Sequence, residues 1–177
     1  MNNKLIAAGF GGQGMMLLGQ LIAYAGMLEG KHVTWLPSYG PEMRGGTANC
    51  TVIVSDKPIG APVVAMPTEI IAMNIPSMLK FTPTLVEKGK LFLNSSMIDR
   101  EPGRTDIEVM RVPANEIADE LGNLKVANIV MLGAYIKKTG ILSQNSIKSA
   151  LEHKLVGKKK ELLELDIKAF EKGTTLV

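Results

Sequence analysis

The chain has 177 residues, of which 46% are hydrophobic, 21% are charged and only 5% are aromatic. This length suits one domain with a substantial core, and the composition argues against a disordered chain. The formal net charge is +3, which together with the low aromatic content argues against a nucleic-acid-binding protein.

The single cysteine and the distribution of apolar residues narrow the class of protein further. A single thiol, Cys50, forms no internal disulfide and cannot alone hold zinc or an iron–sulfur cluster. We therefore predict that Cys50 is a small buried hydrophobic residue in a strand. Five glycines between Gly9 and Gly19 interrupt the segment that most resembles a signal peptide. The longest apolar stretch, 126–136, contains Asn128 and is too short to span a bilayer. We therefore expect a cytoplasmic protein with no membrane span and no metal site of its own.

Apolar periodicity and turn residues divide the chain into an α/β part and a helical part. Strands are predicted over residues 4–8, 32–36, 48–55, 69–73, 90–93 and 107–112, and helices over 15–28 and 77–87. From about residue 113 the pattern is helical, with helices over 114–121, 126–139, 143–155 and 159–172. The alternation predicts a three-layer αβα, Rossmann-like fold with helices on both faces of the sheet. No internal repeat or boundary divides the chain, so we expect residues 1–177 to form a single domain.

The connection between the second and third predicted strands decides the type of sheet. Residues 37–46 contain two prolines, three glycines and no helical periodicity. No crossover helix fits there, which argues against a purely parallel sheet. We therefore predict a mixed sheet that is mostly parallel elsewhere. A connection of this length and composition in a compact domain is usually functional or disordered.

A glycine-rich loop joins the first strand to the first helix. Gly9, Gly11 and Gly14 have the G-x-G-x-x-G spacing that lets a backbone approach a pyrophosphate at a helix N-terminus. Tight packing of a strand on a helix also favours glycine, so the spacing alone is a weak signal. A glycine loop that binds a nicotinamide dinucleotide is normally accompanied by an acidic residue at the end of the second strand. Here Glu29 precedes that strand and Glu42 lies well beyond it. The pattern therefore indicates a phosphate-bearing ligand and disfavours NAD or FAD.

A second loop, 38–46 (SYGPEMRGG), follows the second strand and is expected at the same edge of the sheet. Arg44 offers a fork of donors for phosphate or carboxylate, and Tyr39 adds a hydroxyl and an aromatic face. Structural alternatives exist, because Glu42 and Arg44 can pair with each other and Tyr39 can simply pack. The density of such residues beside the glycine loop favours a binding role.

Polar residues elsewhere carry weaker signals. His32 and His153 have no metal-ligand spacing, and residue order supports no nucleophile with its base. Asn74, and Asn94 with the two serines after it, follow predicted strands, where such residues cap helices or line a cleft. We assign no catalytic residue to this chain.

Taken together, the two loops resemble one family. Residues 9–14 and 37–50 (PSYGPEMRGGTANC) closely resemble the γ subunit of 2-oxoacid:ferredoxin oxidoreductases, which is also found as one domain of the fused pyruvate enzyme. The similarity extends through 70–74 (IIAMN), 92–96 (FLNSS) and 128–140, and thus covers most of the chain.

The resemblance implies a role in a larger enzyme. The family oxidatively decarboxylates a 2-oxoacid on thiamine diphosphate, passes electrons through iron–sulfur clusters to ferredoxin, and delivers the acyl group to coenzyme A. The γ module has an αβα fold, assembles with α and β subunits and often a ferredoxin-like δ subunit, and contributes to the coenzyme A side of the active site. The PSYGPEMRGG form favours 2-oxoglutarate or branched-chain 2-oxoacids as substrates, with an indolepyruvate-type relative as an option.

The resemblance implies that coenzyme A is contacted by Gly11, Gly12, Gln13 and Gly14, with Arg44 as the cationic contact. Tyr39 and Glu42 match the family's loop and are expected to line the cleft or contact another subunit. The chain lacks a Gly-Asp-Gly motif for the magnesium of thiamine diphosphate and a cysteine set for a cluster. These cofactors are therefore expected on partner subunits, and the chain is not expected to be active alone.

Three alternatives remain open at the level of sequence. The apolar segments 15–28 and 126–136 suit either subunit contacts, including contacts with a second copy, or a buried core. Two alternatives to an oxidoreductase subunit also remain. The chain could be a stand-alone nucleotide-binding or regulatory Rossmann-like protein, or it could be a structural subunit whose glycine loop binds nothing.

Overall fold

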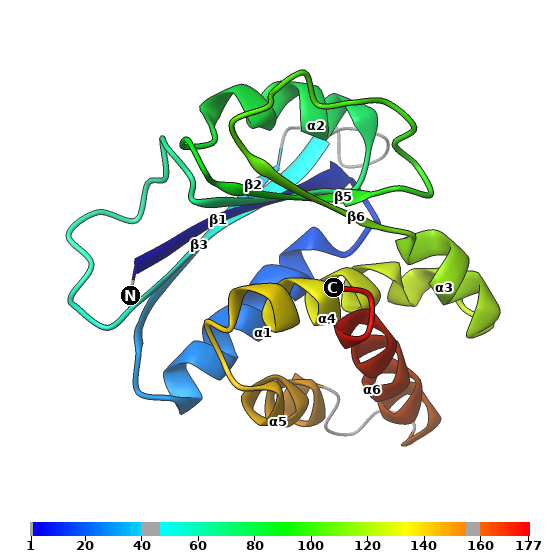
Figure 1. The fold of residues 1–177 in the computed structure, drawn as a ribbon. Coiled ribbons are helices and arrows are strands. Elements are labelled where there is room, and N and C mark those ends of the chain that lie inside the picture. Colours follow the sequence, from blue (N-terminus) through cyan, green and yellow to red (C-terminus); the bar gives the residue numbers. More distant parts are fainter. Residues whose placement is uncertain (1, 40–46, 155–159) are drawn as a thin grey trace.

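A six-stranded sheet forms the centre of the molecule (Figure 1). The computed structural model describes residues 2–39, 47–154 and 160–177. The strands are β1 (Asn2–Phe10), β2 (His32–Tyr39), β3 (Thr47–Ser55), β4 (Glu69–Ala72), β5 (Lys90–Asn94) and β6 (Glu108–Val112). The helices are α1 (Met15–Leu28), α2 (Ile75–Phe81), α3 (Ala114–Glu120), α4 (Ala127–Thr139), α5 (Gln144–Lys154) and α6 (Lys160–Thr174), with short 3₁₀ turns η1 (Thr82–Thr84) and η2 (Leu124–Val126).

The sheet is mixed and mostly parallel, as the sequence predicted. Its strand order is β2-β3-β1-β4-β5-β6. β1, β4, β5 and β6 pair in parallel, whereas β3 runs antiparallel to both of its neighbours, β1 and β2. The seven residues between β2 and β3 are too few for a crossover helix, so these two strands must reverse direction. β2 consequently points the same way as the parallel strands and lies at the edge of the sheet.

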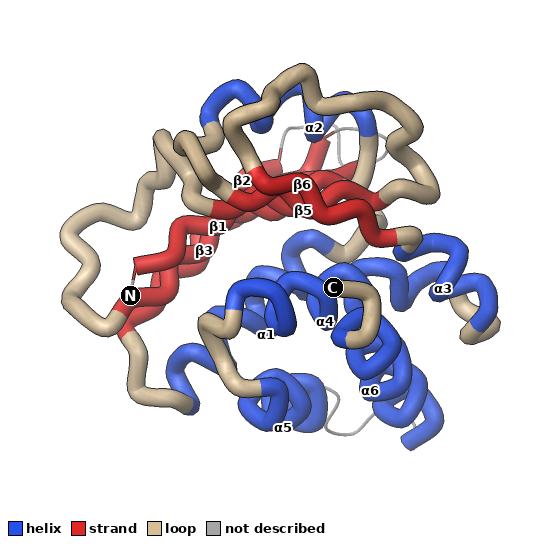
Figure 2. Tube along the Cα trace, in the orientation of Figure 1, coloured by secondary structure: helices blue, strands red, loops and turns tan. Residues whose placement is uncertain are grey.

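The two faces of the sheet are covered unequally (Figure 2). Helices α1, α3, α4, α5 and α6 lie on one face, and α2, η1 and the connecting loops lie on the other. Alternate residues of β1 face the two layers. Leu5 and Ala7 belong to the larger apolar cluster under the five helices, and Ile6 and Ala8 belong to the smaller cluster under α2. The predicted three-layer αβα fold is confirmed, with one thick and one thin helical layer.

The thin layer contains the main departure from the predicted elements. A helix was expected over residues 77–87, but α2 ends at Phe81 and a 3₁₀ turn follows. Pro83 explains the difference, because a proline inside a helix lacks the N–H group that the preceding turn requires. The helix instead begins earlier, at Ile75, since the Asn74 side chain accepts a hydrogen bond from the Ser77 N–H at 2.9 Å and caps it.

Helix α4 lies in the core of this chain. Every residue from Ala127 to Ile136 is buried within the chain, so the apolar segment 126–136 is core and not a subunit surface. Helix α1 buries one side and leaves Met27 62% exposed on the other. Among the described helices, none combines the length and the apolar character that a bilayer crossing requires.

Candidate binding site at the carboxyl edge of the sheet

The glycine loop turns β1 sharply into α1. The Gln13 N–H donates to the Phe10 carbonyl at 3.1 Å, which closes a tight turn. Gly12 and Gly14 have φ values of +96° and +75°, in the left-handed region that side chains with a β-carbon rarely adopt. Gly14 is also the N-cap of α1, and no side chain caps that helix end. These two glycines are therefore required by the backbone path that brings the loop to the helix N-terminus.

Gln13 fastens the loop to the end of β4. Its Oε1 atom accepts hydrogen bonds from the Phe10 N–H at 2.6 Å and from the Asn74 Nδ2 at 3.1 Å. Asn74 in turn caps α2. The side chain of Gln13 thus has a structural role, and a β-carbon at Gly9 would lie only 2.7 Å from the same Oε1. Gly9 therefore leaves space for the Gln13 side chain.

Asn128 joins the glycine loop to the start of α4. Its Nδ2 donates to the Gly14 carbonyl at 3.0 Å, across 114 positions of sequence. A β-carbon on Gly14 would overlap the Asn128 amide, so this contact gives a second reason for glycine at that position. Asn128 is only 2% exposed. The N-termini of α1 and α4 are therefore held side by side.

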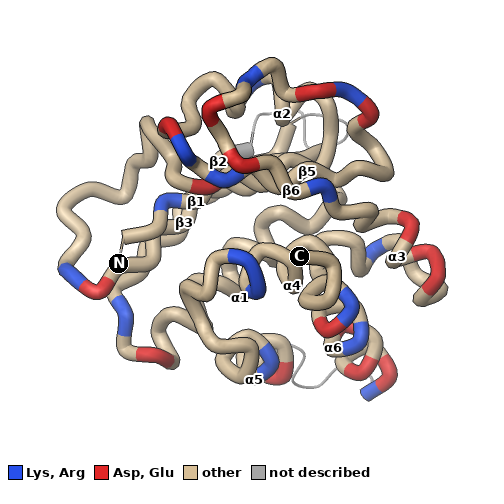
Figure 3. The backbone as a smooth tube through the Cα atoms, in the orientation of Figure 1, with Lys and Arg blue, Asp and Glu red and all other residues tan. Residues whose placement is uncertain are grey.

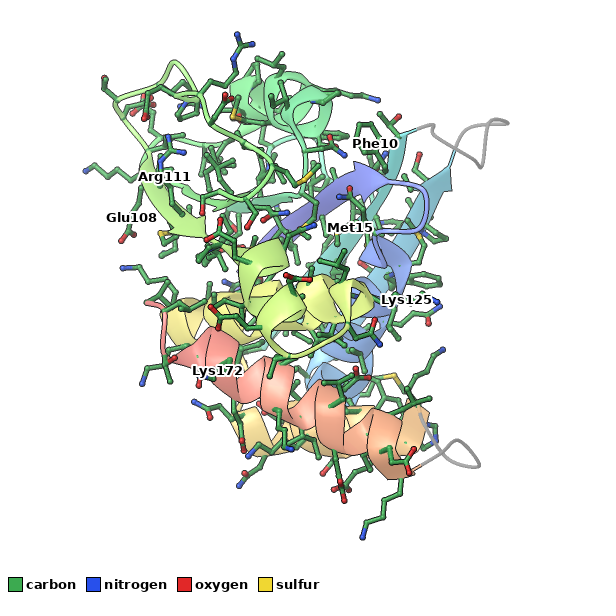
Figure 4. All side chains as sticks on the ribbon, turned by 90° about the vertical axis from the view of Figure 1, so that its right-hand side faces the viewer. Phe10, Met15, Glu108, Arg111, Lys125 and Lys172 are labelled. Carbon is green, nitrogen blue, oxygen red and sulfur yellow. The ribbon has the colours of Figure 1, made fainter. Side chains whose placement is uncertain are left out.

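A cavity of about 210 Å³ opens where these elements meet. It is lined by Gly12, Gln13, Met73, Asn115, Leu124, Lys125, Ala127 and Asn128. These residues come from the ends of β1 and β4, from the start of α3 and from the η2–α4 junction. Figure 4 shows Phe10, Met15 and Lys125 along one side of the molecule, where β1 passes into α1. The cavity thus lies at the carboxyl edge of the parallel strands, where open α/β sheets bind ligands.

Among the polar residues at the strand ends, Asn74 and Ser96 bind backbone N–H groups at helix starts, and none lines the cavity. Asn74 caps α2, as already described, and Ser96 accepts a hydrogen bond from the Glu116 N–H at 3.2 Å. Asn94 is fully buried, and its Nδ2 donates to Asn115 Oδ1 at 2.8 Å. Asn94 therefore does not line the cavity. Instead, it supports Asn115, which does.

Part of the second predicted loop lies outside the described residues. This holds for Glu42, for Arg44 and for the side chain of Tyr39, whose backbone ends β2. The flanking strands are described: Tyr39 pairs with Ala48, and Thr47 pairs with Phe10. The strand ends that enclose segment 40–46 therefore lie at the same sheet edge as the glycine loop.

Cys50 is buried beneath α1 and away from the cavity. Its thiol lies 3.2 Å from the Met15 carbonyl, to which it donates. Burial raises the pKa of the Cys50 thiol to about 12, although hydrogen bonds involving Trp35 and Gly19 oppose the shift. The thiol is protonated at neutral pH and is a poor nucleophile. The prediction of a small buried hydrophobe in a strand is confirmed.

Helices α1 and α4, which begin beside the cavity, contain few charged residues (Figure 3). Helix α1 contains none, and the only charged residues of α4 are two lysines in its last turn. Neither helix has an acidic residue in its first turn. Lys125 is the only charged residue among those described that line the cavity. Within the described ranges, no three His, Cys, Asp or Glu side chains gather as a metal site would require.

Three polar residues of the cavity were not predicted as site residues: Asn115, Lys125 and Asn128. They lie more than 100 positions from the glycine loop, and only the fold brings them to it. One signal existed for Asn128, because an asparagine within an otherwise apolar stretch needs a hydrogen-bond partner. No pattern in the sequence distinguishes Lys125 from the other lysines.

Comparisons with known proteins bear on the family and the fold of this chain. The family described as "Pyruvate ferredoxin/flavodoxin oxidoreductase" matches residues 4–176. The chain is 37% identical to ketoisovalerate oxidoreductase subunit VorA of Methanothermobacter thermautotrophicus over 94% of its length, but spans only 34% of that relative. It is 34% identical to 2-oxoglutarate synthase subunit KorC of Methanocaldococcus jannaschii, covering 98% of this chain and 92% of KorC.

A solved structure shows the same fold within a larger chain. The 2-oxoglutarate:ferredoxin oxidoreductase of Magnetococcus marinus, with 2-oxoglutarate, coenzyme A and succinyl-CoA bound, is 25% identical and superimposes with a TM-score of 0.91. The match covers 99% of this chain and 31% of that chain. The chain therefore belongs to the pyruvate ferredoxin/flavodoxin oxidoreductase family, in which it represents the γ-subunit module.

Proposed function

We propose that this chain is the γ subunit of a cytoplasmic, thiamine-diphosphate-dependent, coenzyme A-acylating 2-oxoacid:ferredoxin oxidoreductase. One observation carries the proposal: the glycine loop, fixed to the N-termini of α1 and α4, borders a cavity at the carboxyl edge of the sheet. Helix N-termini and tight glycine loops are suited to phosphate groups. The Magnetococcus relative, whose structure contains coenzyme A, includes this same module.

The substrate that we propose is 2-oxoglutarate or a branched-chain 2-oxoacid. Two relatives are named for these substrates, a ketoisovalerate oxidoreductase subunit and a 2-oxoglutarate synthase subunit, and they are 37% and 34% identical to this chain. The two identities are too close to choose between the substrates. A 2-oxoacid would in any case react on the thiamine diphosphate of another subunit.

The division of labour within the proposed complex follows from what this chain offers. Its single cysteine is buried under α1, so iron–sulfur clusters and thiamine diphosphate with its magnesium would be held by α, β and δ subunits. Ferredoxin would accept electrons from those subunits. The chain spans about a third of the length of VorA, so this module functions in some relatives as one part of a longer polypeptide.

Within this chain, the proposed coenzyme A contacts are Gly11, Gly12, Gln13 and Gly14, with Arg44 as a cationic contact from the neighbouring loop. Backbone N–H groups and one guanidinium neutralise a diphosphate without covalent chemistry. Tyr39 and Glu42 would line the cleft or contact another subunit.

The alternative from a different class is a stand-alone nucleotide-binding or regulatory protein. The glycine loop favours it to a limited extent, but no acidic residue at the end of β2 is available for a ribose. A second alternative is a structural subunit whose loop binds nothing. Gly9 fits this view, since a β-carbon there would lie 2.7 Å from the Gln13 Oε1 atom, so side-chain packing by itself accounts for a glycine.

A matched pair of glycine variants tests the proposed site. Gly12 and Gly30 both have positive φ values, +96° and +70°, and a β-carbon at either would meet nothing within 4 Å. Gly12→Ala and Gly30→Ala therefore carry similar backbone strain, about 1 kcal/mol each, but only Gly12 lines the cavity. We expect Gly12→Ala to weaken coenzyme A binding to the co-purified complex at least fivefold relative to Gly30→Ala, measured by titration calorimetry. Equal affinities of the two variants would refute the assignment.

A further inference from the structure

Helix α1 has an exposed side that carries no charge. Of the helices that the structure describes, α1 alone contains no charged residue. It packs on β2 and β3 and against α5, yet its last turn leaves Met27 62% exposed and Leu28 51% exposed. A helix that is apolar on all sides is normally covered on all sides. The described part of the chain leaves this side of α1 without a covering element.

A pocket of about 290 Å³ opens on this side of α1. Its walls come from the second half of α1, from Trp35 of β2 and from the end of α5. The lining is mostly apolar or aromatic, and the Tyr24 ring stacks on the His153 ring with centroids 4.3 Å apart and planes inclined by 20°. No residue lines both this pocket and the cavity at the carboxyl edge of the sheet. The pocket is therefore a second, separate feature of the surface.

The rim of the pocket carries one charged group. Among the described residues that line the pocket, Lys154 is the only lysine, and none is an arginine or a carboxylate. The Lys154 Nζ donates to Gln20 Oε1 at 2.7 Å, which holds the ammonium group at the rim. None of the ion pairs between described residues involves Lys154. An apolar centre with a polar rim is the arrangement of a protein interface. Its complement is an apolar side chain with a carboxylate beside it.

Two observations indicate what covers the pocket. In VorA and in the Magnetococcus enzyme, this module matches 34% and 31% of a longer chain. Fusion keeps a module permanently against the rest of its polypeptide, and permanent interfaces bury apolar surface of this kind. A second copy of this chain fits less well, because a two-fold interface places the same patch on both sides. The Lys154 side chains of the two copies would then approach each other as like charges.

We propose that this pocket docks another subunit of the enzyme, which inserts an apolar side chain against Tyr24, Met27 and Trp35 and places a carboxylate on Lys154. The inference rests on the proposed function, since it assigns one surface of this chain to the complex proposed there. The partner is the subunit that corresponds to the remainder of the longer relatives. The docking also accounts for the uncharged side of α1, because that side is buried once the complex forms.

A matched pair of methionine variants tests the centre of the pocket. Met27 and Met66 are 62% and 64% exposed, but only Met27 lines the pocket. Each tagged variant is expressed with its partner subunits, and the amount of partner that it retains is measured. We expect Met27→Glu to retain about tenfold less partner than Met66→Glu, because it places a charge in the apolar centre beside the partner's carboxylate. Urea unfolding of the two variants alone should give similar midpoints, since both side chains are exposed.

Lys154→Glu tests the rim, with Lys57→Glu as its control. Both lysines are exposed, but Lys57 follows β3 and does not line the pocket. We expect Lys154→Glu to reduce the retained partner about fivefold, the upper range for an exposed ion pair, and Lys57→Glu to leave it unchanged. A carbodiimide couples an amine to a carboxylate in contact with it, with loss of water. In the unmodified complex it should join Lys154 to an Asp or Glu of another subunit.

The outcomes separate the docking surface from the proposed function. A coenzyme A-dependent complex that assembles equally well with Met27→Glu and with Lys154→Glu would overturn the docking surface and leave the proposed function intact. A cross-link that joins Lys154 only to a second copy of this chain would also overturn it, because the pocket would then be a homodimer contact. An unmodified chain that co-purifies with no thiamine-diphosphate subunit would overturn both proposals.

Discussion

At the scale of single residues, the most unusual charged group is Glu69 at the start of β4. It is only 4% exposed, and it accepts hydrogen bonds from Asn3 Nδ2 at 2.9 Å and from Thr68 Oγ1 at 2.6 Å. Burial raises the pKa of the Glu69 carboxyl above 4.5, its value in an unfolded chain, and outweighs the hydrogen bonds that lower it. The folded protein therefore holds the proton more tightly than the unfolded chain.

This pKa shift predicts a pH dependence of stability. A group whose pKa is higher in the folded state stabilises the fold when it is protonated, and this contribution is lost as the pH rises from about 4.5 through the folded pKa. We expect the unfolding free energy of the unmodified chain to fall relative to that of Glu69→Gln between pH 5 and pH 8. Urea unfolding of both proteins at the two pH values measures the difference. A difference between the two that does not vary with pH would contradict the assignment.

The site residues show how far a sequence can be interpreted one position at a time. Gly12 and Gly14 were predictable, because a tight strand-to-helix turn requires positive φ and the spacing indicates such a turn. The structural role of Gln13 was not predictable, because its hydrogen bond to Asn74 spans 61 positions of the sequence. Lys125 belongs to the site only because α4 packs beside α1. Residues that meet through tertiary packing leave no local pattern in the sequence.

At the scale of elements, the tightest packing in the helical layer is the crossing of α4 and α6. A β-carbon on Gly133 would overlap the Phe170 carbonyl, and one on Gly173 would overlap the Val130 carbonyl. The two glycine Cα atoms therefore bring the backbones into direct contact. This crossing fixes α4, and α4 in turn holds the glycine loop through Asn128.

The crossing predicts a stability change with an unusual sign. Alanine is normally favoured over glycine inside a helix by about 1 kcal/mol. At Gly133 the clash with backbone atoms should reverse this, and we expect Gly133→Ala to lower the unfolding free energy by about 1–3 kcal/mol, the usual cost of overpacking. Gly60→Ala is the control, because a β-carbon there meets nothing within 4 Å and φ is not positive. Urea unfolding that ranks Gly133→Ala at or above the unmodified chain would contradict the packing.

Most elements were predictable, and their arrangement was only partly so. Apolar periodicity located the strands and the long helices, because burial on one face imposes that period. The unequal layers were not predictable, since amphipathicity shows that a helix face is buried but not which side of the sheet it covers. The early end of α2 could have been anticipated from Pro83.

At the scale of the whole molecule, the central claim is that this chain supplies the coenzyme A side of an active site whose redox chemistry lies elsewhere. Its cavity lies at one edge of the sheet, and the chain corresponds to about a third of a longer relative. The family was predictable because its two most characteristic motifs, at residues 9–14 and 37–50, are continuous stretches of the sequence. The substrate was not, since the 2-oxoacid would contact other subunits.

Activity of the purified chain and of the complex is the most direct test. The chain should be purified alone and also together with its thiamine-diphosphate and ferredoxin-like subunits from the native host. Each preparation is then assayed for reduction of a viologen dye with 2-oxoglutarate or 2-oxoisovalerate, with and without coenzyme A. The account predicts coenzyme A-dependent turnover by the complex and none by the chain alone. Clear turnover by the isolated chain, or a complex that is indifferent to coenzyme A, would contradict it.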